Sequence, residues 1–545
     1  MKPNLPEATP RPAQTGLGNK LPAGQERFLR ITHDAKLNVS HDLPTSLDGY
    51  ELSLMGNLPF ENQELHDQGT SYPSIELGGL NAGHYYFKAR LDKEGSETLS
   101  NPKGYTHLMV DPSGLDNIRL YSFIPNISGS IDDWIADLPR IKALGFNTLH
   151  LLPITPMDAS QSPYSARSFY GVDERYLKEG GASLEDFVNE AKNLNIGLCF
   201  DLVLNHVGVT SDLAKQCPEW IHSDHERVDG LKRAGCWHGD SWLTWEDLAL
   251  IHYDHPDAVI RQEIWDYMLG VLLHWSAMAE ATGGMIRLDN LHSTEPNFLR
   301  WAMAKLHQTH PKLIVLGELF ASKEEQRSMV LEHGLHLLLA TPWDKHYVPD
   351  LRNLVRELHE DYPRLKFILP ISSHDSGTPT QEFYDVRATV PRYAVSALLN
   401  TGATGMCQGV EYGAAQKLEF IGHQGKVAIQ GPVEFHDEIS DLNQLMEDHS
   451  LLRQGGNLHF IDNQHGAILG AYRHSFDPQK PSLVVLINLD LHHEQSIQLQ
   501  PDDSHLAKGD QLRNLFGYHR GTIHDLPSTI KLPPCGVRLL EVLHN

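Results

Sequence analysis

The sequence predicts an α/β fold, a closed (β/α)8 TIM barrel of parallel strands, with a β-sandwich before it and another after it. After Pro112, apolar runs typical of buried strands alternate with amphipathic helical segments, and there are eight such runs. Four of the runs end at acidic or histidine residues. In a barrel of parallel strands, the catalytic residues lie at these carboxyl ends of the strands. An open, doubly wound sheet is the alternative, and charged groups spread over four strand ends argue against it.

The eight predicted strands are short and mostly apolar. They cover residues 118–124, 148–153, 196–204, 284–289, 313–319, 335–341, 367–373 and 404–409. Most of the intervals hold a helix, and the one at residues 183–195 begins with Ser183 three residues before Asp186, a variant of the capping box. The interval after the third strand is too long for a single crossover, so it predicts a short excursion domain at about residues 207–256.

The regions before and after the barrel lack the alternation of strand-like and helical segments. Residues 1–24 are polar and rich in Pro, and we expect a flexible tail there. Residues 25–112 hold short β-type runs broken by Gly, Pro and Asn, which suggests a small antiparallel N-terminal β-sandwich. The barrel is predicted at residues 113–450, and strand-like runs in residues 451–545 predict a C-terminal β-sandwich.

Charge and composition narrow the choice of partners. The formal net charge of −25 disfavours nucleic acid, because its phosphates would be repelled. The chain has no apolar run long enough to span a bilayer, so no membrane partner is expected. The N-terminus lacks the apolar region of a secretory signal, and the five cysteines show no paired spacing. Together these features suggest a protein of the reducing cytoplasm.

Three acidic residues end predicted strands, and a barrel would bring them to one mouth: Asp289, Glu318 and Asp375. Retaining glycosidases need two carboxyl groups about 5 to 5.5 Å apart, and neighbouring strands lie about 4.8 Å apart. Asp289 and Glu318, on the fourth and fifth strands, are expected to meet that spacing. Alone, each of the three residues is more typical of a helix cap or a surface charge, whereas their joint placement favours catalysis.

The neighbours of these carboxylates suggest separate roles. Arg287 precedes Asp289 by two residues, on the same face of the strand, and its charge would keep that carboxylate ionised, as a nucleophile requires. Burial and the charge of Asp289 would raise the pKa of Glu318, which suits a general acid. Asp375 follows His374, and it would stabilise the positive charge that builds on the anomeric carbon.

Four segments resemble the signature motifs of the α-amylase family of glycoside hydrolases: DLVLNH at residues 201–206, IRLDNLH at 286–292, GELF at 317–320 and SSHD at 372–375. The resemblance covers nearly everything after residue 112, and it implies the barrel and its flanking β domains. It also implies Asp289 as nucleophile, Glu318 as acid/base and Asp375 as transition-state stabiliser. The substrate-binding residues that it implies are Tyr164, Asn205, His206, Arg287 and His374.

The run DNLHSTEP, which begins at Asp289, departs from the usual α-amylase pattern. It is closer to the glucanotransferase half of glycogen-debranching enzymes and to maltosyltransferases that use maltose 1-phosphate. The run QGVEYG, around Glu411, is typical of the second group, the maltosyltransferases. The retained His374 is not typical of that group.

The function predicted from this pattern is hydrolysis of α-1,4-glucosidic bonds in maltodextrin or glycogen-like glucans, with retention of configuration. The alternative is glycosyl transfer, of the 4-α-glucanotransferase or maltosyltransferase type, by the same catalytic residues. An inactive barrel that only binds glucan is less favoured, because all three carboxylates are present. The sequence leaves homo-oligomerisation open.

No cofactor is predicted, although two regions raise the question of a metal. Asn205 is a calcium ligand in many α-amylases, but no acid-rich loop clearly supplies the about six to eight oxygens that calcium needs. Histidines of the excursion suggest zinc, but no HxxxH helix supports it, and solvated loop histidines are the preferred interpretation. These are His222, His225, His238, His252 and His255. Three tryptophans there, Trp237, Trp242 and Trp245, are expected either to stack on sugar rings or simply to pack.

Overall fold

The computed structural model describes residues 27–32, 37–40, 51–58, 63–66, 74–77, 79–92, 99–100, 105–238, 241–461, 465–475, 480–501, 506–517, 520–526 and 528–544. The predicted N-terminal tail, residues 1–24, lies outside this part of the chain. The chain divides into two compact units. The first comprises Met1–Leu115, Tyr164–Tyr170 and Leu202–Leu337, and the second comprises Asp116–Pro163, Gly171–Asp201 and Leu338–Asn545.

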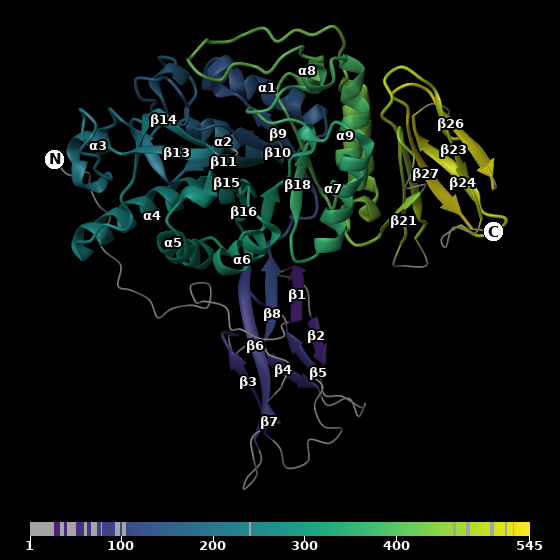
Figure 1. Ribbon diagram of the computed structural model, residues 1–545, viewed down its shortest axis with the longest axis horizontal. Helices are drawn as coiled ribbons and strands as arrows, with labels where there is room; N and C mark the ends of the chain where they lie inside the picture. The colour runs from purple at the N-terminus through teal and green to yellow at the C-terminus, as the bar shows by residue number, and fades with distance from the viewer. Residues whose placement is uncertain are drawn as a thin grey trace. The chain divides into compact units, whose positions relative to one another are not determined.

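Eight parallel strands close into a barrel in the order β10-β11-β15-β16-β17-β18-β19-β9 (Figure 1). Their bounds are β9 Ile118–Phe123, β10 Thr148–Leu151, β11 Gly197–Val203, β15 Met285–Asp289, β16 Ile314–Gly317, β17 Leu337–Leu339, β18 Phe367–Pro370 and β19 Ala403–Cys407. Nearly every side chain in these strands is buried, because a barrel strand faces packed side chains on one side and helices on the other. The predicted barrel is confirmed.

Helices follow the barrel strands along the chain. They are α1 Ile131–Ala143, α2 Leu184–Asn193, α4 Ala258–Ala281, α5 Pro296–Thr309, α6 Lys323–His333, α7 Val348–Asp361, α8 Pro379–Phe383, α9 Thr389–Leu399 and α10 His436–Asp448. Ser183 caps α2, and its hydroxyl accepts from the backbone N–H of Asp186 while the Asp186 carboxylate accepts from the backbone of Ser183. This confirms the capping box predicted at residues 183–195.

The long interval after β11 folds as a small antiparallel sheet with short helices. Its elements are β12 His206–Gly208, α3 Asp212–Gln216, the 3-10 turn η5 Pro218–Trp220, β13 Arg233–His238 and β14 Ser241–Leu250. The strand order is β12-β14-β13, and His206 pairs with Leu250. The sheet of the excursion therefore begins at His206, a residue predicted from the sequence to bind sugar.

The N-terminal region forms two sheets. One has the order β1-β8-β6-β3, with β7 added to β6, and the other has the order β2-β5-β4. The strands are β1 Arg27–Thr32, β2 Leu37–Ser40, β3 Glu51–Gly56, β4 Gln63–His66, β5 Ser74–Leu77, β6 Gly83–Asp92, β7 Leu99–Ser100 and β8 Thr106–Asp111. The expected antiparallel arrangement holds for the other pairs, but β1 runs parallel to β8, from Arg27 opposite Thr106 to Thr32 opposite Asp111.

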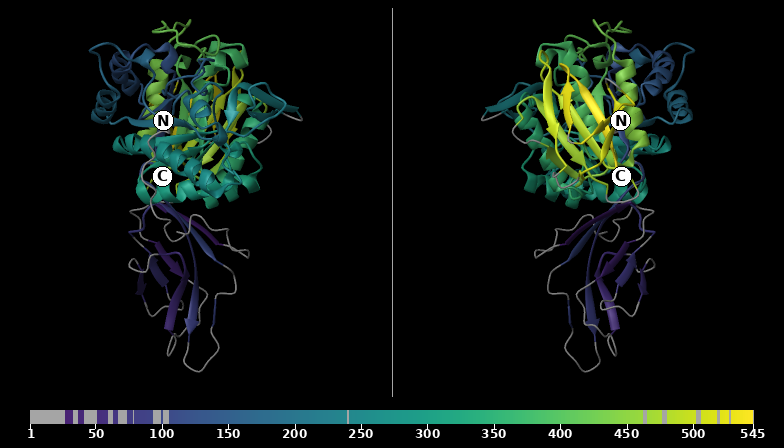
Figure 2. Two further views of the ribbon diagram at one scale, coloured as in Figure 1. Left: turned by 90° about the vertical axis from the view of Figure 1, so that its left-hand side faces the viewer. Right: turned by 90° about the vertical axis from the view of Figure 1, so that its right-hand side faces the viewer.

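The C-terminal region is built from two antiparallel sheets, ordered β20-β21-β22-β27-β24-β25 and β23-β26, whose strands are yellow in Figure 2. The strands are β20 Leu458–Ile461, β21 Ile468–Arg473, β22 Leu483–Asn488, β23 Gln495–Leu499, β24 Gln511–Phe516, β25 Ile523–Asp525, β26 Ser528–Leu532 and β27 Val537–Leu543. Val484 and Leu540 of the larger sheet share one core with Ile497 and Ile530 of the smaller. Two sheets around one core make a sandwich, as the sequence predicts.

Candidate active site

The ends of β15 and β16 bring two of the predicted carboxylates together. In the register of this parallel pair, Arg287 lies opposite Leu316 and Leu288 lies opposite Gly317. Asp289 and Glu318 are the next residues on each strand, so their side chains leave adjacent strands at the same level. The pairing predicted for these two carboxylates therefore follows from the sheet register alone.

One guanidinium joins the two carboxylates. Arg287 Nη1 donates to Asp289 Oδ1 at 3.0 Å, and Arg287 Nη2 lies 2.7 Å from Glu318 Oε1. The side chain of Arg287 is 5% exposed, and those of Asp289 and Glu318 are each 13% exposed. The contact with Asp289 agrees with the prediction from its spacing. The contact with Glu318 was not predicted, because it depends on the neighbouring strand.

The backbone after Asp289 also holds Glu318. Asn290 adopts a left-handed conformation with φ of 44°, which Asn tolerates better than most residues. In this conformation its backbone N–H donates to Glu318 Oε2 at 2.9 Å. Glu318 thus accepts from Arg287 on one oxygen and from Asn290 on the other, which fixes the plane of its carboxylate.

His206 and Tyr164 form a second predicted group in the same unit. His206 is buried, and its Nε2 lies 3.1 Å from the backbone oxygen of Tyr164. Burial lowers the pKa of His206 to about 4, against a smaller opposing effect of the Tyr164 carbonyl. His206 is therefore neutral at pH 7, and its Nδ1 has no hydrogen-bond partner among the described residues. A neutral imidazole with an unused nitrogen can bind a sugar hydroxyl.

The predicted tryptophans of the excursion differ in their surroundings. The ring of Trp245 meets His206 edge-on, with centroids 5.7 Å apart. Trp242 is 50% exposed. The side chain of Trp237 lies outside the described part of the chain. Trp245 therefore packs against a predicted sugar contact, which fits both of the interpretations that its sequence position allowed.

In the second unit, the end of β18 carries His374 and Asp375. His374 Nε2 lies 3.0 Å from Asp375 Oδ2; the histidine is buried and the aspartate side chain is 57% exposed. The backbone N–H of Asp375 donates to the hydroxyl of Ser373 at 3.1 Å, which helps to form the turn. The Asp375 carboxylate is therefore exposed to solvent beside a buried histidine.

A buried chain of polar groups beneath His374 was missed by the sequence analysis. His150 Nε2 lies 3.0 Å from Asp201 Oδ2, and His150 Nδ1 lies 3.0 Å from the hydroxyl of Ser122. The ring centroid of His150 is 6.1 Å from that of His374. Asp201 opens the motif DLVLNH, and that position was the only available signal. His150 thus links Asp201 and Ser122 to the ring of His374.

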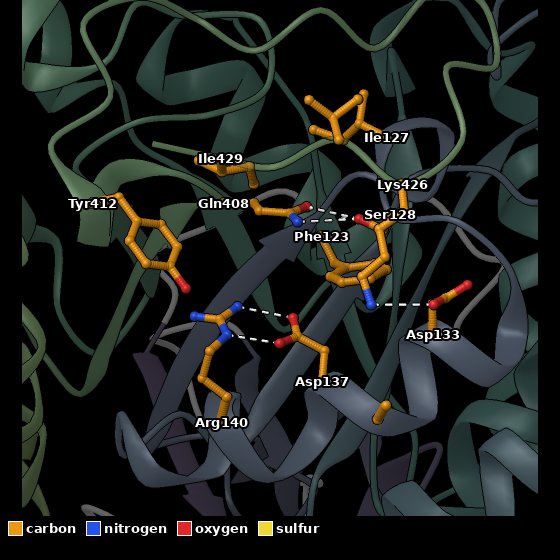
Figure 3. A pocket seen from close by; sticks show the side chains of 12 residues that line it. Phe123, Ile127, Ser128, Asp133, Asp137, Arg140, Gln408, Tyr412, Lys426 and Ile429 are labelled. Atoms are coloured by element: carbon orange, nitrogen blue, oxygen red, sulfur yellow. Dashed lines mark hydrogen bonds and ion pairs between the residues drawn. The ribbon is translucent and has the colours of Figure 1, made fainter. Parts of the chain in front are cut away.

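A further polar network lies at the ends of β9 and β19. The buried Glu411 accepts from the hydroxyl of Tyr121 and from Arg140 Nη1, the latter at 2.9 Å. Figure 3 shows Arg140 paired with Asp137. Both side chains line a cavity of 200 Å³ next to this network. Each charged side chain that lines the cavity has an opposite charge as partner, Arg140 with Asp137 and Lys426 with Asp133. The network ties α1 to the end of β19.

The resemblance also leaves calcium open at Asn205. This residue is buried, and neither polar atom of its side chain has a hydrogen-bond partner among the described residues. Calcium needs about six to eight oxygen ligands. Within the described residues, the only group of three or more His, Cys, Asp or Glu side chains with metal-ligand spacing is His222, His252 and Asp254, which does not include Asn205. Calcium at Asn205 stays a prediction.

Comparison with solved structures places the fold. The α-amylase of Geobacillus thermoleovorans superposes with a TM-score of 0.64 and 16% identity, over 79% of this chain and 99% of that one. The maltogenic α-amylase AmyB of Thermotoga neapolitana superposes with a TM-score of 0.64 and 19% identity, over 79% and 100%. A sequence profile of the glycogen debranching enzyme glucanotransferase domain matches residues 113–226.

Sequence relatives add the decisive comparison. The alpha-1,4-glucan:maltose-1-phosphate maltosyltransferase of Cereibacter sphaeroides is 25% identical over 456 residues, which cover 74% of this chain and 63% of that protein. The enzyme of the same name from Myxococcus xanthus is 23% identical over 398 residues, 66% of this chain and 56% of that protein. These comparisons support the resemblance of the chain to the α-amylase family.

The chain spans about three fifths of the length of these maltosyltransferases. The family resemblance stated from its motifs is confirmed, including the similarity to maltosyltransferases and to the debranching transferase domain. No helix in the described part of the chain has the length and apolarity to cross a membrane.

Proposed function

We propose that this chain is a retaining enzyme of α-glucan metabolism that transfers glycosyl units through a covalent intermediate on Asp289. The observation that carries the proposal is the bridge of Arg287 to Asp289 and Glu318 at the ends of two adjacent strands. A double displacement needs two carboxyl groups about 5 to 5.5 Å apart, and the spacing of about 4.8 Å between adjacent strands supports that separation.

In the first step, a carboxylate oxygen of Asp289 attacks the anomeric carbon. The bond from that carbon to the leaving oxygen breaks, and Glu318 supplies the proton that the leaving oxygen takes up. In the second step, an acceptor hydroxyl attacks the same carbon, Glu318 takes its proton, and the bond to Asp289 breaks. Two inversions at one carbon return the original configuration.

We further propose that Asp375 joins this pair as the residue that stabilises positive charge in the transition state. All strands of the barrel are parallel, so β15, β16 and β18 end at the same rim of one closed cylinder. The partners of Asp375 support this role, because His374 and Ser373 orient it without burying it. Tyr164, Asn205, His206 and His374 are the proposed sugar contacts.

Transfer is favoured over the hydrolysis that the sequence analysis takes as its first choice. The relatives are named for the use of maltose 1-phosphate and α-1,4-glucan, and the profile match is to a glucanotransferase domain. With maltose 1-phosphate as donor, the leaving group is phosphate and the acceptor is the end of a glucan chain. The reaction needs no cofactor, because bond cleavage draws only on carboxylates.

Hydrolysis is the second candidate, and one observation favours it. The chain retains His374 before Asp375, as α-amylases do and as the maltosyltransferase pattern does not. The same covalent intermediate then passes to water instead of to a sugar, so the difference lies in the acceptor alone.

Two incubations test the proposal. With maltoheptaose alone, a 4-α-glucanotransferase forms oligosaccharides longer and shorter than the substrate, whereas a hydrolase forms only shorter ones. With maltose 1-phosphate and glycogen, a maltosyltransferase releases phosphate and lengthens the glycogen chains. The Asp289→Asn variant is the control in both. If the protein gives no reaction with either substrate, the proposed function is wrong.

A further inference from the structure

Three metal-ligating side chains converge in the excursion, away from the carboxylates. His222 Nε2 lies 3.2 Å from Asp254 Oδ1, and His252 Nε2 lies 3.6 Å from the same oxygen. One donor atom of each of the three residues lies within 4.8 Å of the other two. The imidazole rings of His222 and His252 are 3.9 Å apart between centroids. Both nitrogens thus approach one carboxylate oxygen from the same side.

The backbone holds these residues in place. Ile221 and Ile251 form an antiparallel bridge, so the histidines that follow them lie on neighbouring extended segments. The N–H of His222 donates to the oxygen of Leu250 at 2.9 Å, and the N–H of His252 donates to the oxygen of Trp220 at 2.8 Å. Asp254 follows His252 by two residues. The three ligands therefore come from a hydrogen-bonded frame and not from independent loops.

We propose that His222, His252 and Asp254 bind a divalent transition-metal ion, with zinc as the best match. Two imidazole nitrogens and one carboxylate oxygen are a ligand set that zinc favours, at about 2.0 to 2.2 Å, with a fourth tetrahedral position for water or another side chain. Small rotations of exposed side chains bring the donor atoms to those distances, because Asp254 is 65% exposed.

The charges around the cluster are mixed. Asp254 attracts a cation, and Lys232 and His255 oppose it. The ring of His255 lies 4.8 Å from that of His252, which makes it the nearest further imidazole.

The site would brace the junction between the excursion and the barrel. The segment that carries His252 and Asp254 runs directly on from β14, whose last residue, Leu250, pairs with His206 and accepts from the N–H of His222. The N–H of Ile251 donates to the backbone oxygen of Asn205 at 3.1 Å. The role is structural: the ion fixes the segment on which two predicted sugar contacts depend, and it takes no part in bond cleavage.

Binding is tested on the full chain after removal of metals with a chelator. Calorimetric titration with Zn²⁺ is expected to show about one saturable equivalent per chain, and the thermal midpoint is expected to rise when zinc is added. Co²⁺ should give the visible absorption of a four-coordinate site. The double variant His222→Ala/His252→Ala should lose at least about tenfold in affinity, since even outer-shell changes cost that much.

His225→Ala is the matched control, because this exposed histidine lies in the same excursion but outside the cluster. It should bind zinc as the unaltered protein does. Asp254→Asn, an exposed and nearly isosteric change, should weaken binding even if the double variant fails to fold. Absence of saturable binding, or equal binding by Asp254→Asn and the unaltered protein, would overturn the proposal. Neither readout depends on glycosyl transfer.

Discussion

Arg287 contacts two carboxylates that have opposite tasks. A nucleophile works as the anion, whereas a general acid must carry a proton when the leaving group departs. The guanidinium contacts Asp289 through one nitrogen and Glu318 through another. A single cation therefore holds both carboxylates in position, and under the proposed function its removal should affect both steps of the reaction.

Asp289→Asn is expected to lower turnover by about 10³-fold or more, because a neutral amide cannot attack the anomeric carbon. The rate of glucan conversion under saturating substrate measures this loss. Thermal unfolding of the variant should remain close to that of the unaltered protein, because the side chain is small and partly exposed. Full retention of the rate would end the assignment of the nucleophile.

Glu318→Gln is expected to slow reactions with poor leaving groups by about 10²- to 10⁴-fold, the usual contribution of a general acid. Activated aryl glucosides leave without a proton, so formation of the intermediate from them should be affected much less. The ratio of the two rates is the measurement. Equal losses on both kinds of substrate would contradict the acid role.

Arg287→Lys keeps the charge but offers a single point donor in place of a planar fork. It cannot contact both carboxylates with the same geometry, and we expect a loss of about 10²-fold in kcat/KM, the size typical of a small misplacement of catalytic groups. Arg227→Lys, at an exposed ion pair with Glu246, is the control and should leave the rate unchanged. An active Arg287→Lys variant would show that charge alone suffices.

At the scale of single residues, the sequence predicted a side-chain contact within one strand and the pairing of Asp289 with Glu318. It missed two side-chain contacts that join different strands. The spacing of Arg287 and Asp289 revealed their contact, since side chains two apart share a face. The contact of Arg287 with Glu318 and that of His150 with Asp201 join different strands. Such contacts depend on register, and no single segment of sequence encodes register.

Among the elements, the barrel strands were predictable because strands buried on both faces are continuous apolar runs. Helix starts were predictable where a capping residue marks them, as at Ser183. The parallel pairing of β1 with β8 was not predictable, because the two strands are far apart in the chain and their composition suits parallel and antiparallel pairing equally. Local pattern determines what an element is, and long-range packing determines its partner.

The network around Glu411 yields a prediction about elements. Glu411 is fully buried at the end of β19 and accepts from Arg140 of α1. Glu411→Ala should lower the free energy of unfolding by about 1 to 3 kcal/mol, because it leaves the buried hydroxyl of Tyr121 and the N–H of Gly409 without their acceptor. Urea unfolding measures the change. Glu246→Ala, at a pair whose carboxylate side chain is 70% exposed, should have a much smaller effect.

At the scale of the whole molecule, buried histidines make stability depend on pH. Burial lowers the pKa of His206 and His307 to about 4 and that of His359 to about 3, from 6.5 in the unfolded chain. The unfolded state therefore takes up protons that the folded state does not as the pH falls below 6.5. The stability that these neutral rings provide is present above pH 6.5 and is lost progressively down to about pH 4.

The free energy of unfolding, measured by urea denaturation at pH values from 7 to 4, should fall steadily as the pH is lowered. Each such histidine contributes at most about 1.4 kcal/mol per pH unit to the slope of this free energy against pH. His307→Leu should reduce the slope, because it removes one of these groups from α5. His225→Ala, at an exposed position, should leave it unaltered. A stability that stays constant over this pH range would contradict the assignment of neutral buried rings.

The start of β12 at His206 has a consequence for how such enzymes diverge. The residue is the first of β12, and it pairs with the last residue of β14 in the excursion sheet, where β14 lies between β12 and β13. Under the proposed function, insertions between β12 and β14 would alter what an incoming chain end meets while this first strand keeps its pairing. A scaffold arranged in this way can swap the recipient of a sugar and leave its cleavage chemistry untouched.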